Sequence, residues 1–174
     1  MSLSKPEMAP NAALVAALLS RGLTVAVAES LTGGQLVAAL IDVPGASATV
    51  LGGVVAYNTA LKHSLLGVSA ELLAEHGPVH PEVAEQMAVG VRAALAVDGR
   101  PADVGLSTTG VAGPQPQGGQ PVGTVYLGVA VGAGVHSVAL ELSGSRSQIR
   151  SATVAAALTQ ALATVLGLAG ENPE

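Results

Sequence analysis

Short apolar segments alternate with amphipathic ones along the chain. Three segments, residues 23–28, 49–57 and 102–108, are almost continuously apolar, which is typical of strands buried on both faces of a parallel sheet. Two later segments, residues 122–131 and 135–142, are joined by Gly132-Ala133-Gly134 and predict a β-hairpin. The sequence therefore predicts about five strands, and the hairpin requires one of them to be antiparallel.

Helical patterns lie between these strands and at both ends. The helices are predicted at residues 11–20 and 32–41, after Asn58, after Ser69, from Pro81 to Gly99, and from Ser145 onward. Two helix starts have the pattern of a capping box, in which a Ser or Thr and a Gln three residues later satisfy each other's backbone amides. These pairs are Thr32 with Gln35 and Ser145 with Gln148.

This order of elements predicts an α/β fold: a three-layer α/β/α sandwich around a mixed, mostly parallel sheet with one antiparallel strand. No internal repeat or linker divides the 174 residues, so we expect one domain over residues 11–168. Residues 1–10 are expected to form a flexible lead-in and residues 169–174 a tail.

Composition narrows the class of protein. Only seven residues are Lys or Arg and the net charge is −5, which argues against a nucleic-acid surface. The chain has no cysteine and residues 1–11 lack the apolar region of a signal peptide, so we expect a cytoplasmic protein. The last helix is apolar, but Thr153, Thr159, Gln160 and Thr164 interrupt it. We therefore expect it to lie on the sheet and not in a membrane.

The first stretch with candidate chemistry follows the first strand. Glu29 and Ser30 lie between that strand and Gly33-Gly34, at the carboxyl end of a strand, where open α/β sheets bind ligands. The glycines expose backbone N–H groups that suit an anion or an oxyanion. From this stretch alone, Ser30 is either a nucleophile or an ordinary helix-starting serine.

The second stretch follows the second strand and contains Tyr57, Asn58 and Lys62. Lys5 lies in the lead-in, so Lys62 is the one lysine of the predicted domain. Burial and a position near a helix start both lower the pKa of a lysine, which is what a general base requires. The alternative is a solvated lysine on a short helix.

Two further stretches offer polar ligand contacts. Residues 107–114 begin with three hydroxyl residues, including Thr108 and Thr109, and continue with Gly110. Arg146 and Arg150 lie four residues apart at the start of the last helix, where the dipole, amides and guanidinium groups would all favour phosphate. The alternatives are that residues 107–114 form an ordinary turn and that the two arginines lie on the surface of a helix without a ligand. The histidines have no spacing typical of a metal site, so we expect no metal and no other cofactor.

Taken together, five motifs resemble one family. AESLTGG, GGVVAYNTALK, STTGVAGP, GGQPVGTVYLGV and GSRSQIR occur in this order, and the chain over residues 11–166 is similar to the CinA C-terminal domain. That domain also exists alone as nicotinamide mononucleotide deamidase (PncC). The resemblance implies an α/β/α domain and a metal-independent amidohydrolase of pyridine nucleotide salvage. Its reaction is hydrolysis of nicotinamide mononucleotide to nicotinate mononucleotide and ammonia.

The resemblance also implies roles for individual residues. Ser30 matches the family's nucleophile and Lys62 its general base, with Tyr57 in support. The substrate-binding residues that we expect are Thr32, Gly33, Gly34, Thr108, Thr109, Gly110, Arg146 and Arg150. The expected partner is a small mononucleotide, and Ala-rich helix faces favour a homo-oligomer, most simply a dimer.

The sequence departs from the family pattern at two places. The family usually has Asp before the arginine at position 146, whereas this chain has Ser145, and residues 115–120 are rich in Gln and Pro where glycine is commoner. The first departure leaves a second hypothesis open: a non-catalytic mononucleotide-binding module of the competence/damage-inducible CinA type. An amidohydrolase for another small carboxamide is a third.

Overall fold

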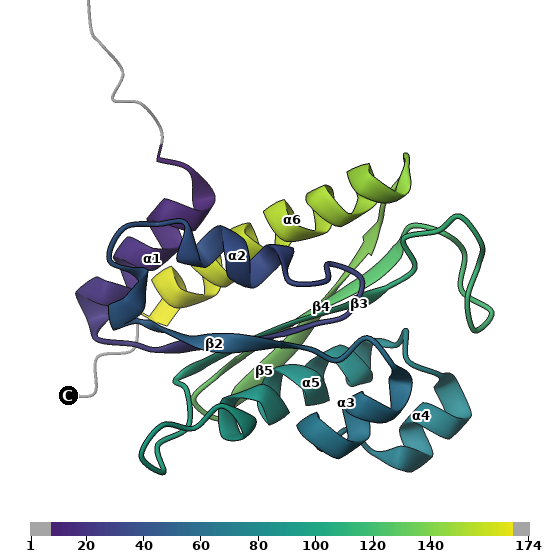
Figure 1. Ribbon diagram of the computed structural model, residues 1–174, viewed down its shortest axis with the longest axis horizontal. Helices are drawn as coiled ribbons and strands as arrows, with labels where there is room; N and C mark the ends of the chain where they lie inside the picture. Colours follow the sequence, from purple (N-terminus) through teal and green to yellow (C-terminus); the bar gives the residue numbers. More distant parts are fainter. Residues whose placement is uncertain (1–7, 169–174) are drawn as a thin grey trace, which may run out of the picture.

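The computed structural model describes residues 8–168 and contains a five-stranded sheet between two layers of helices (Figure 1). The elements in chain order are α1 (Pro10–Arg21), β1 (Val25–Glu29), α2 (Gln35–Ile41), a 3-10 turn (Ala46–Ala48), β2 (Val50–Val55), α3 (Thr59–Leu66), α4 (Ala70–His76), α5 (Pro81–Ala94), β3 (Val104–Gly110), β4 (Thr124–Val131), β5 (Gly134–Glu141) and α6 (Arg146–Gly167). The proposed lead-in and tail lie largely outside the described residues.

The sheet has the strand order β2-β1-β3-β4-β5. β1 pairs in parallel with β2 and with β3, while β4 is antiparallel to both β3 and β5. β4 is therefore the one strand that opposes the other four. The predicted mixed, mostly parallel sheet and its hairpin are confirmed. The hairpin turn is one residue shorter than expected, because Gly134 already belongs to β5 and pairs with Val131.

Two apolar clusters hold the layers together. One joins α1, α2 and α6 to one face of the sheet, and the other joins α3, α4 and α5 to the opposite face (Figure 1). Because the sequence contains no Phe or Trp, the core consists of small aliphatic side chains. Glycine brings one helix even closer to the sheet. A Cβ at Gly105 of β3 would lie 1.9 Å from the Ala88 carbonyl oxygen of α5, so α5 packs directly on the sheet backbone.

Most predicted helices are present with small shifts at their ends, but α5 is shorter than expected. It ends at Ala94 instead of Gly99. Val97 and Arg100 exchange two backbone hydrogen bonds across a tight turn, with Asp98 and Gly99 at positive φ. The turn reverses the chain toward β3, and a helix that continued to Gly99 would prevent it.

α6 is long and apolar enough to cross a membrane by length and composition. In the structure it lies on the sheet beside α1, and its buried residues include Ile149, Leu158 and Val165. This is the arrangement expected from the polar residues that interrupt its sequence.

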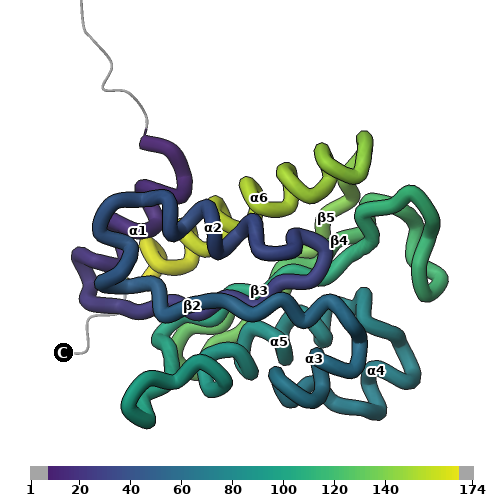
Figure 2. Tube along the Cα trace, in the orientation of Figure 1, coloured from purple at the N-terminus to yellow at the C-terminus, as the bar shows by residue number. Residues whose placement is uncertain are grey.

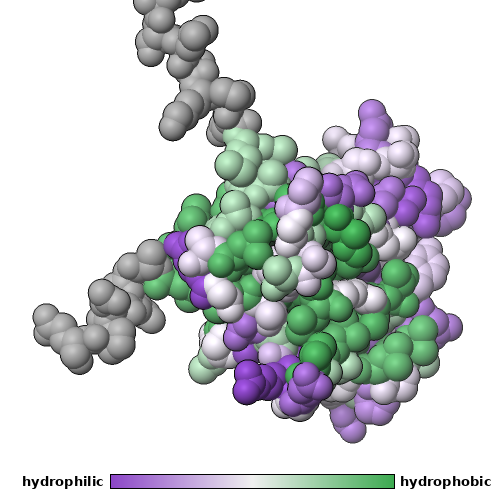
Figure 3. Space-filling view, turned by 60° about the vertical axis from the view of Figure 1, so that its left-hand side comes forward, coloured by the Kyte–Doolittle hydropathy of each residue, from purple (hydrophilic) through white to green (hydrophobic). Residues whose placement is uncertain are grey.

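Apolar residues also gather on the surface, where one face of the molecule shows a broad apolar area (Figure 3). Exposed apolar side chains include Val55 on the edge strand β2 and Leu61 and Leu65 on α3. β2 carries no charged residue, and charge is a usual protection of a sheet edge against pairing. The homo-oligomer expected from the sequence stays a prediction. We propose the β2 edge as the surface through which two copies of the chain would associate.

Candidate active site

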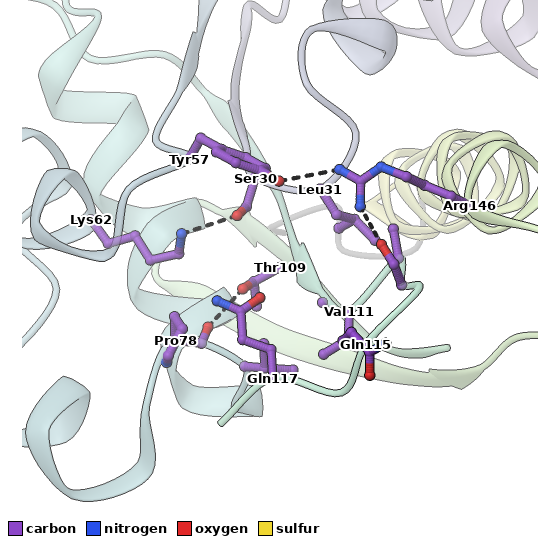
Figure 4. A pocket seen from close by; sticks show the side chains of 14 residues that line it. Ser30, Leu31, Tyr57, Lys62, Pro78, Thr109, Val111, Gln115, Gln117 and Arg146 are labelled. Carbon is purple, nitrogen blue, oxygen red and sulfur yellow. Dashed lines mark hydrogen bonds between the residues drawn. The ribbon is translucent and has the colours of Figure 1, made fainter. Parts of the chain in front are cut away.

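A cavity lies at the carboxyl ends of the parallel strands. The chain leaves β1 for the layer that contains α2 and leaves β2 for the layer that contains α3 (Figure 2). Such a divergence opens a crevice, the usual ligand site of an open α/β sheet. The cavity is lined by Ser30, Leu31, Tyr57, Lys62, Pro78, Val79, Thr109, Gly110, Val111, Ala112, Gly113, Gln115, Gln117 and Arg146 (Figure 4).

Ser30 and Lys62 meet at one side of this cavity (Figure 4). Lys62 Nζ is 3.0 Å from Ser30 Oγ and donates a second hydrogen bond, of 2.7 Å, to the Ala56 carbonyl oxygen. Lys62 is 1% exposed, and no carboxylate forms an ion pair with it within residues 8–168. Burial lowers the pKa of Lys62 from 10.5 to about 8, because the charged form loses hydration without gaining an opposite charge.

The turn that carries Ser30 is organised by the preceding residue, Glu29. The Glu29 carboxylate is fully buried and accepts hydrogen bonds from the amides of Gly34, Leu36 and Val37. It thereby satisfies the N-terminus of α2, where negative charge also suits the helix dipole. Sequence reasoning gave Glu29 no role, although an acidic residue at the end of a strand, a few positions before Gly33-Gly34 and a helix start, was the available signal.

The predicted capping box at the start of α2 is wrong. Gly34 occupies the N-cap position without any side-chain cap, because Glu29 supplies the acceptor. The Thr32 hydroxyl instead bonds that of Thr108 at 2.8 Å. The amide of Gly33 donates to the Ser30 carbonyl oxygen, so the Gly33 and Gly34 amides are both engaged within the protein.

The hydroxyl residues of β3 also make internal hydrogen bonds. Thr108 Oγ1 accepts from the Ser30 amide at 3.4 Å, which ties the turn to β3. Thr109 Oγ1 donates to the Pro78 carbonyl oxygen at 2.6 Å, which ties β3 to the loop before α5. Thr109 lines the cavity and Thr108 does not.

Arg146 extends across the mouth of the cavity from the start of α6 (Figure 4). Its guanidinium donates to the Gly113 carbonyl oxygen at 2.6 Å and to the Tyr57 hydroxyl at 3.2 Å. The predicted capping box of Ser145 and Gln148 is confirmed and fixes the first turn of α6. Tyr57 is 61% exposed and forms the rim of the cavity.

Arg150 lies one helical turn further along α6. Its Nε donates to the Leu31 carbonyl oxygen at 2.8 Å and its Nη2 to the Thr32 carbonyl oxygen at 3.0 Å. The guanidinium thus holds the turn after Ser30 and does not line the cavity.

The structure therefore divides the residues expected at the site. Those that line the cavity are Ser30, Tyr57, Lys62, Thr109, Gly110 and Arg146, whereas Thr32, Gly33, Gly34, Thr108 and Arg150 do not line it. Sequence reasoning missed Pro78 and Val79, which carry no chemical signal and lie in the loop between α4 and α5, where the Pro78 carbonyl accepts from Thr109. Within residues 8–168, no group of three His, Asp or Glu side chains is placed to hold a metal.

Comparison with known proteins matches nearly the whole described chain. The sequence model of the CinA C-terminal domain matches residues 8–165. The chain is 48% identical over 151 residues to a CinA-like protein of Frankia casuarinae, covering 87% of this chain and 34% of the relative. It is 44% identical over 163 residues to a CinA-like protein of Synechococcus elongatus, covering 90% and 37%. The chain thus spans about a third of the length of these curated relatives.

Solved structures match this chain over nearly their full length. A competence-damaged protein (CinA) superfamily protein from Klebsiella pneumoniae has a TM-score of 0.83 at 28% identity, with 91% of this chain and 96% of that chain covered. A competence/damage inducible protein from Agrobacterium tumefaciens has a TM-score of 0.80 at 32% identity, with 92% and 98% covered. On the evidence of its sequence and its mixed five-stranded fold, this chain belongs to the CinA C-terminal domain family.

Proposed function

We propose that the chain is a Ser/Lys amidohydrolase that converts nicotinamide mononucleotide to nicotinate mononucleotide and ammonia in the cytoplasm. The observation that carries this proposal is the buried 3.0 Å contact between Lys62 Nζ and Ser30 Oγ, with the pKa of Lys62 lowered to about 8. A hydroxyl next to an amine that is partly neutral near physiological pH is an activated nucleophile. Its position in a cavity at the strand ends gives a substrate access to it.

The first half of the reaction acylates the serine. Neutral Lys62 accepts the Ser30 hydroxyl proton as Oγ attacks the carboxamide carbon, and the amide oxygen takes the negative charge of the tetrahedral intermediate. The ammonium of Lys62 then returns the proton to the leaving nitrogen, the C–N bond breaks, and ammonia departs. The Ala56 carbonyl oxygen accepts a hydrogen bond from Nζ and so keeps the amine aimed at Ser30.

The second half hydrolyses the acyl-enzyme. Lys62 accepts a proton from water as the water oxygen attacks the ester carbon, and the proton passes to Ser30 Oγ when the ester bond breaks. The products are nicotinate mononucleotide and free Ser30, with Lys62 neutral again.

The oxyanion needs donors other than the Gly33 and Gly34 amides, which are engaged elsewhere. We assign this role to the amide of Leu31. Leu31 lines the cavity, directly follows the nucleophile, and its amide donates to no protein acceptor in the described part of the chain. The amide after the nucleophile has this role in hydrolases with a strand-to-helix nucleophile turn.

The phosphate of the substrate is assigned to Arg146. This arginine lies in the first turn of the 22-residue helix α6, where the helix dipole and the guanidinium both favour an anion. The Gly113 carbonyl and the Tyr57 hydroxyl orient it, so its placement here does not need an aspartate at position 145. Ser145 is used as the cap of α6.

The non-catalytic binding module remains the second candidate, because Ser145 replaces the family's usual aspartate and the matched relatives are named only as CinA-like or competence-damage inducible proteins. An ammonia-release assay with nicotinamide mononucleotide, without added metal, separates the two. We expect turnover in the wild type and none in Ser30→Ala. Tight binding measured by calorimetry with no ammonia over hours would instead select the binding module.

A further inference from the structure

The carbonyl side of the turn that carries Ser30 is held by one side chain. Arg150 donates to two consecutive carbonyl oxygens, those of Leu31 and Thr32, although 119 and 118 positions separate the partners in sequence. The Ser30 amide itself donates a longer bond, of 3.4 Å, to Thr108 Oγ1 of β3.

The local backbone leaves space for this guanidinium. A Cβ on Gly33 would lie 3.2 Å from Arg150 Nη2, closer than a side chain normally packs. Gly33 also has φ +58°, in the left-handed region where glycine has the least strain. The absence of a side chain at Gly33 therefore lets Arg150 approach the Thr32 carbonyl.

Arg146 and Arg150 lie on neighbouring turns of α6 but face different partners. Arg146 spans the cavity mouth to Tyr57 and Gly113, whereas Arg150 is directed at the turn behind Ser30. A planar peptide fixes its N–H opposite its C=O, so the two bonds of Arg150 set the orientation of the peptide groups that follow Ser30.

We infer that Arg150 is a positioning residue, which holds the turn so that Ser30 Oγ stays within reach of Lys62 and of the substrate carbonyl. It is not a substrate ligand, contrary to the role expected from the sequence. The inference rests on the proposed amidohydrolase function. A misplacement of about 1 Å at a nucleophile lowers a rate by about 100-fold, so the loss of Arg150 is expected to act on the chemical step.

The test compares three variants of the full chain. Arg150→Met removes both donors while keeping the aliphatic stem, and Arg150→Lys keeps the charge but cannot supply the two-pronged guanidinium. Arg92→Met is the matched control: Arg92 also donates to two backbone carbonyls, those of Ala102 and Gly132, and it does not line the cavity. Urea unfolding reports the stability of each variant.

Two measurements distinguish a role of Arg150 in positioning Ser30 from a general role in the stability of the fold. The first is kcat and KM for nicotinamide mononucleotide. The second is the rate at which a fluorophosphonate labels Ser30, in which the Oγ–P bond forms, the P–F bond breaks, fluoride leaves and Lys62 takes the proton. The labelling rate reports the reactivity of Ser30 without the natural substrate.

We expect Arg150→Met to lower kcat and the labelling rate together, by about 10- to 100-fold, with KM within about threefold of the wild type. Arg150→Lys should have values between those of Arg150→Met and the wild type. Arg92→Met should keep the wild-type kcat and labelling rate even though it loses about as much stability as Arg150→Met. Wild-type kcat and labelling in Arg150→Met, a rise in KM alone, or an equal loss in Arg92→Met would overturn the inference.

A wild type that labels at Ser30 but releases no ammonia would contradict the proposed function, while the labelling rates would still decide the role of Arg150. A wild type that does neither would overturn both.

Discussion

Lys62 Nζ lies 3.0 Å from Ser30 Oγ, although the two residues are 32 positions apart and follow different strands. The contact exists because β1 and β2 are parallel neighbours, so that their carboxyl ends meet at one edge of the sheet. α3 then brings Lys62 back over the turn after β1. The topology thereby gives a buried amine one hydroxyl partner and one carbonyl partner.

The pH dependence of turnover should follow Lys62. Its pKa of about 8 means that the neutral, proton-accepting form increases as pH rises through about 8, and only about a tenth of the enzyme is active at pH 7. We expect kcat/KM to rise with pH, to reach half of its maximum near pH 8 and to level off above that. Steady-state assays from pH 6 to 9.5 measure this limb, and a flat profile over that range would contradict the general-base role.

Ser30→Ala should abolish ammonia release while preserving the fold. The bonds that hold its turn go to the Glu29 side chain and to the carbonyls of Leu31 and Thr32, and the alanine variant keeps all of them. Circular dichroism and urea unfolding are the controls for the fold. Ammonia release at the wild-type rate would rule out Ser30 as the nucleophile.

Lys62→Met should be inactive but more stable than the wild type at neutral pH. The folded state disfavours the charged amine, so Lys62 destabilises the protein below its folded pKa of about 8. That penalty disappears as pH rises toward the unfolded value of 10.5, because the unfolded chain then holds the extra proton. The lowering of the Lys62 pKa from 10.5 to about 8 corresponds to a penalty of about 3 kcal/mol in the free energy of unfolding.

The stability difference between Lys62→Met and the wild type should therefore decrease between about pH 8 and pH 10. Urea unfolding at pH 7, 8.5 and 10 measures it. A difference that does not change with pH would show that folding does not lower the pKa of Lys62.

Arg146→Met should weaken recognition of the phosphate. Loss of a charged hydrogen-bond donor of this kind removes about 1.5–3 kcal/mol, or about 10- to 150-fold in kcat/KM for nicotinamide mononucleotide. Hydrolysis of free nicotinamide, which has no phosphate, should be slow in the wild type and unchanged by the substitution. An equal loss for both substrates would assign Arg146 to the chemical step instead.

Glu29→Gln should destabilise the fold by about 2–3 kcal/mol, because a neutral amide replaces a buried carboxylate that accepts from three backbone amides. Its NH₂ group would also face one of the amide donors. Glu82→Gln is the matched control, since Glu82 lies in the first turn of α5 with its bond to Gln86 exposed, and we expect it to lose less than about 1 kcal/mol. Equal urea midpoints for the two variants would contradict the capping role of Glu29.

Local signals in the sequence were enough for the elements and for the order of the site motifs. Continuous apolar runs predicted the strands, and a Ser and a Gln at the right spacing predicted the start of α6. These features depend on side-chain periodicity and on bonds within a few residues, which a sequence displays directly. The same signals placed Ser30, Tyr57 and Lys62 at strand ends, and parallel topology makes strand ends meet.

Only the tertiary structure decided the partners of polar groups that bond across different elements. Thr32 has the sequence of a helix cap, yet the Glu29 carboxylate caps α2 and the Thr32 hydroxyl bonds Thr108 instead. Arg150 has the sequence of a phosphate ligand, yet it binds the carbonyls behind Ser30. In both cases the bond joins the residue to a partner that other elements bring within reach. A buried polar group bonds the partner that packing presents, which the spacing of residues along the chain does not specify.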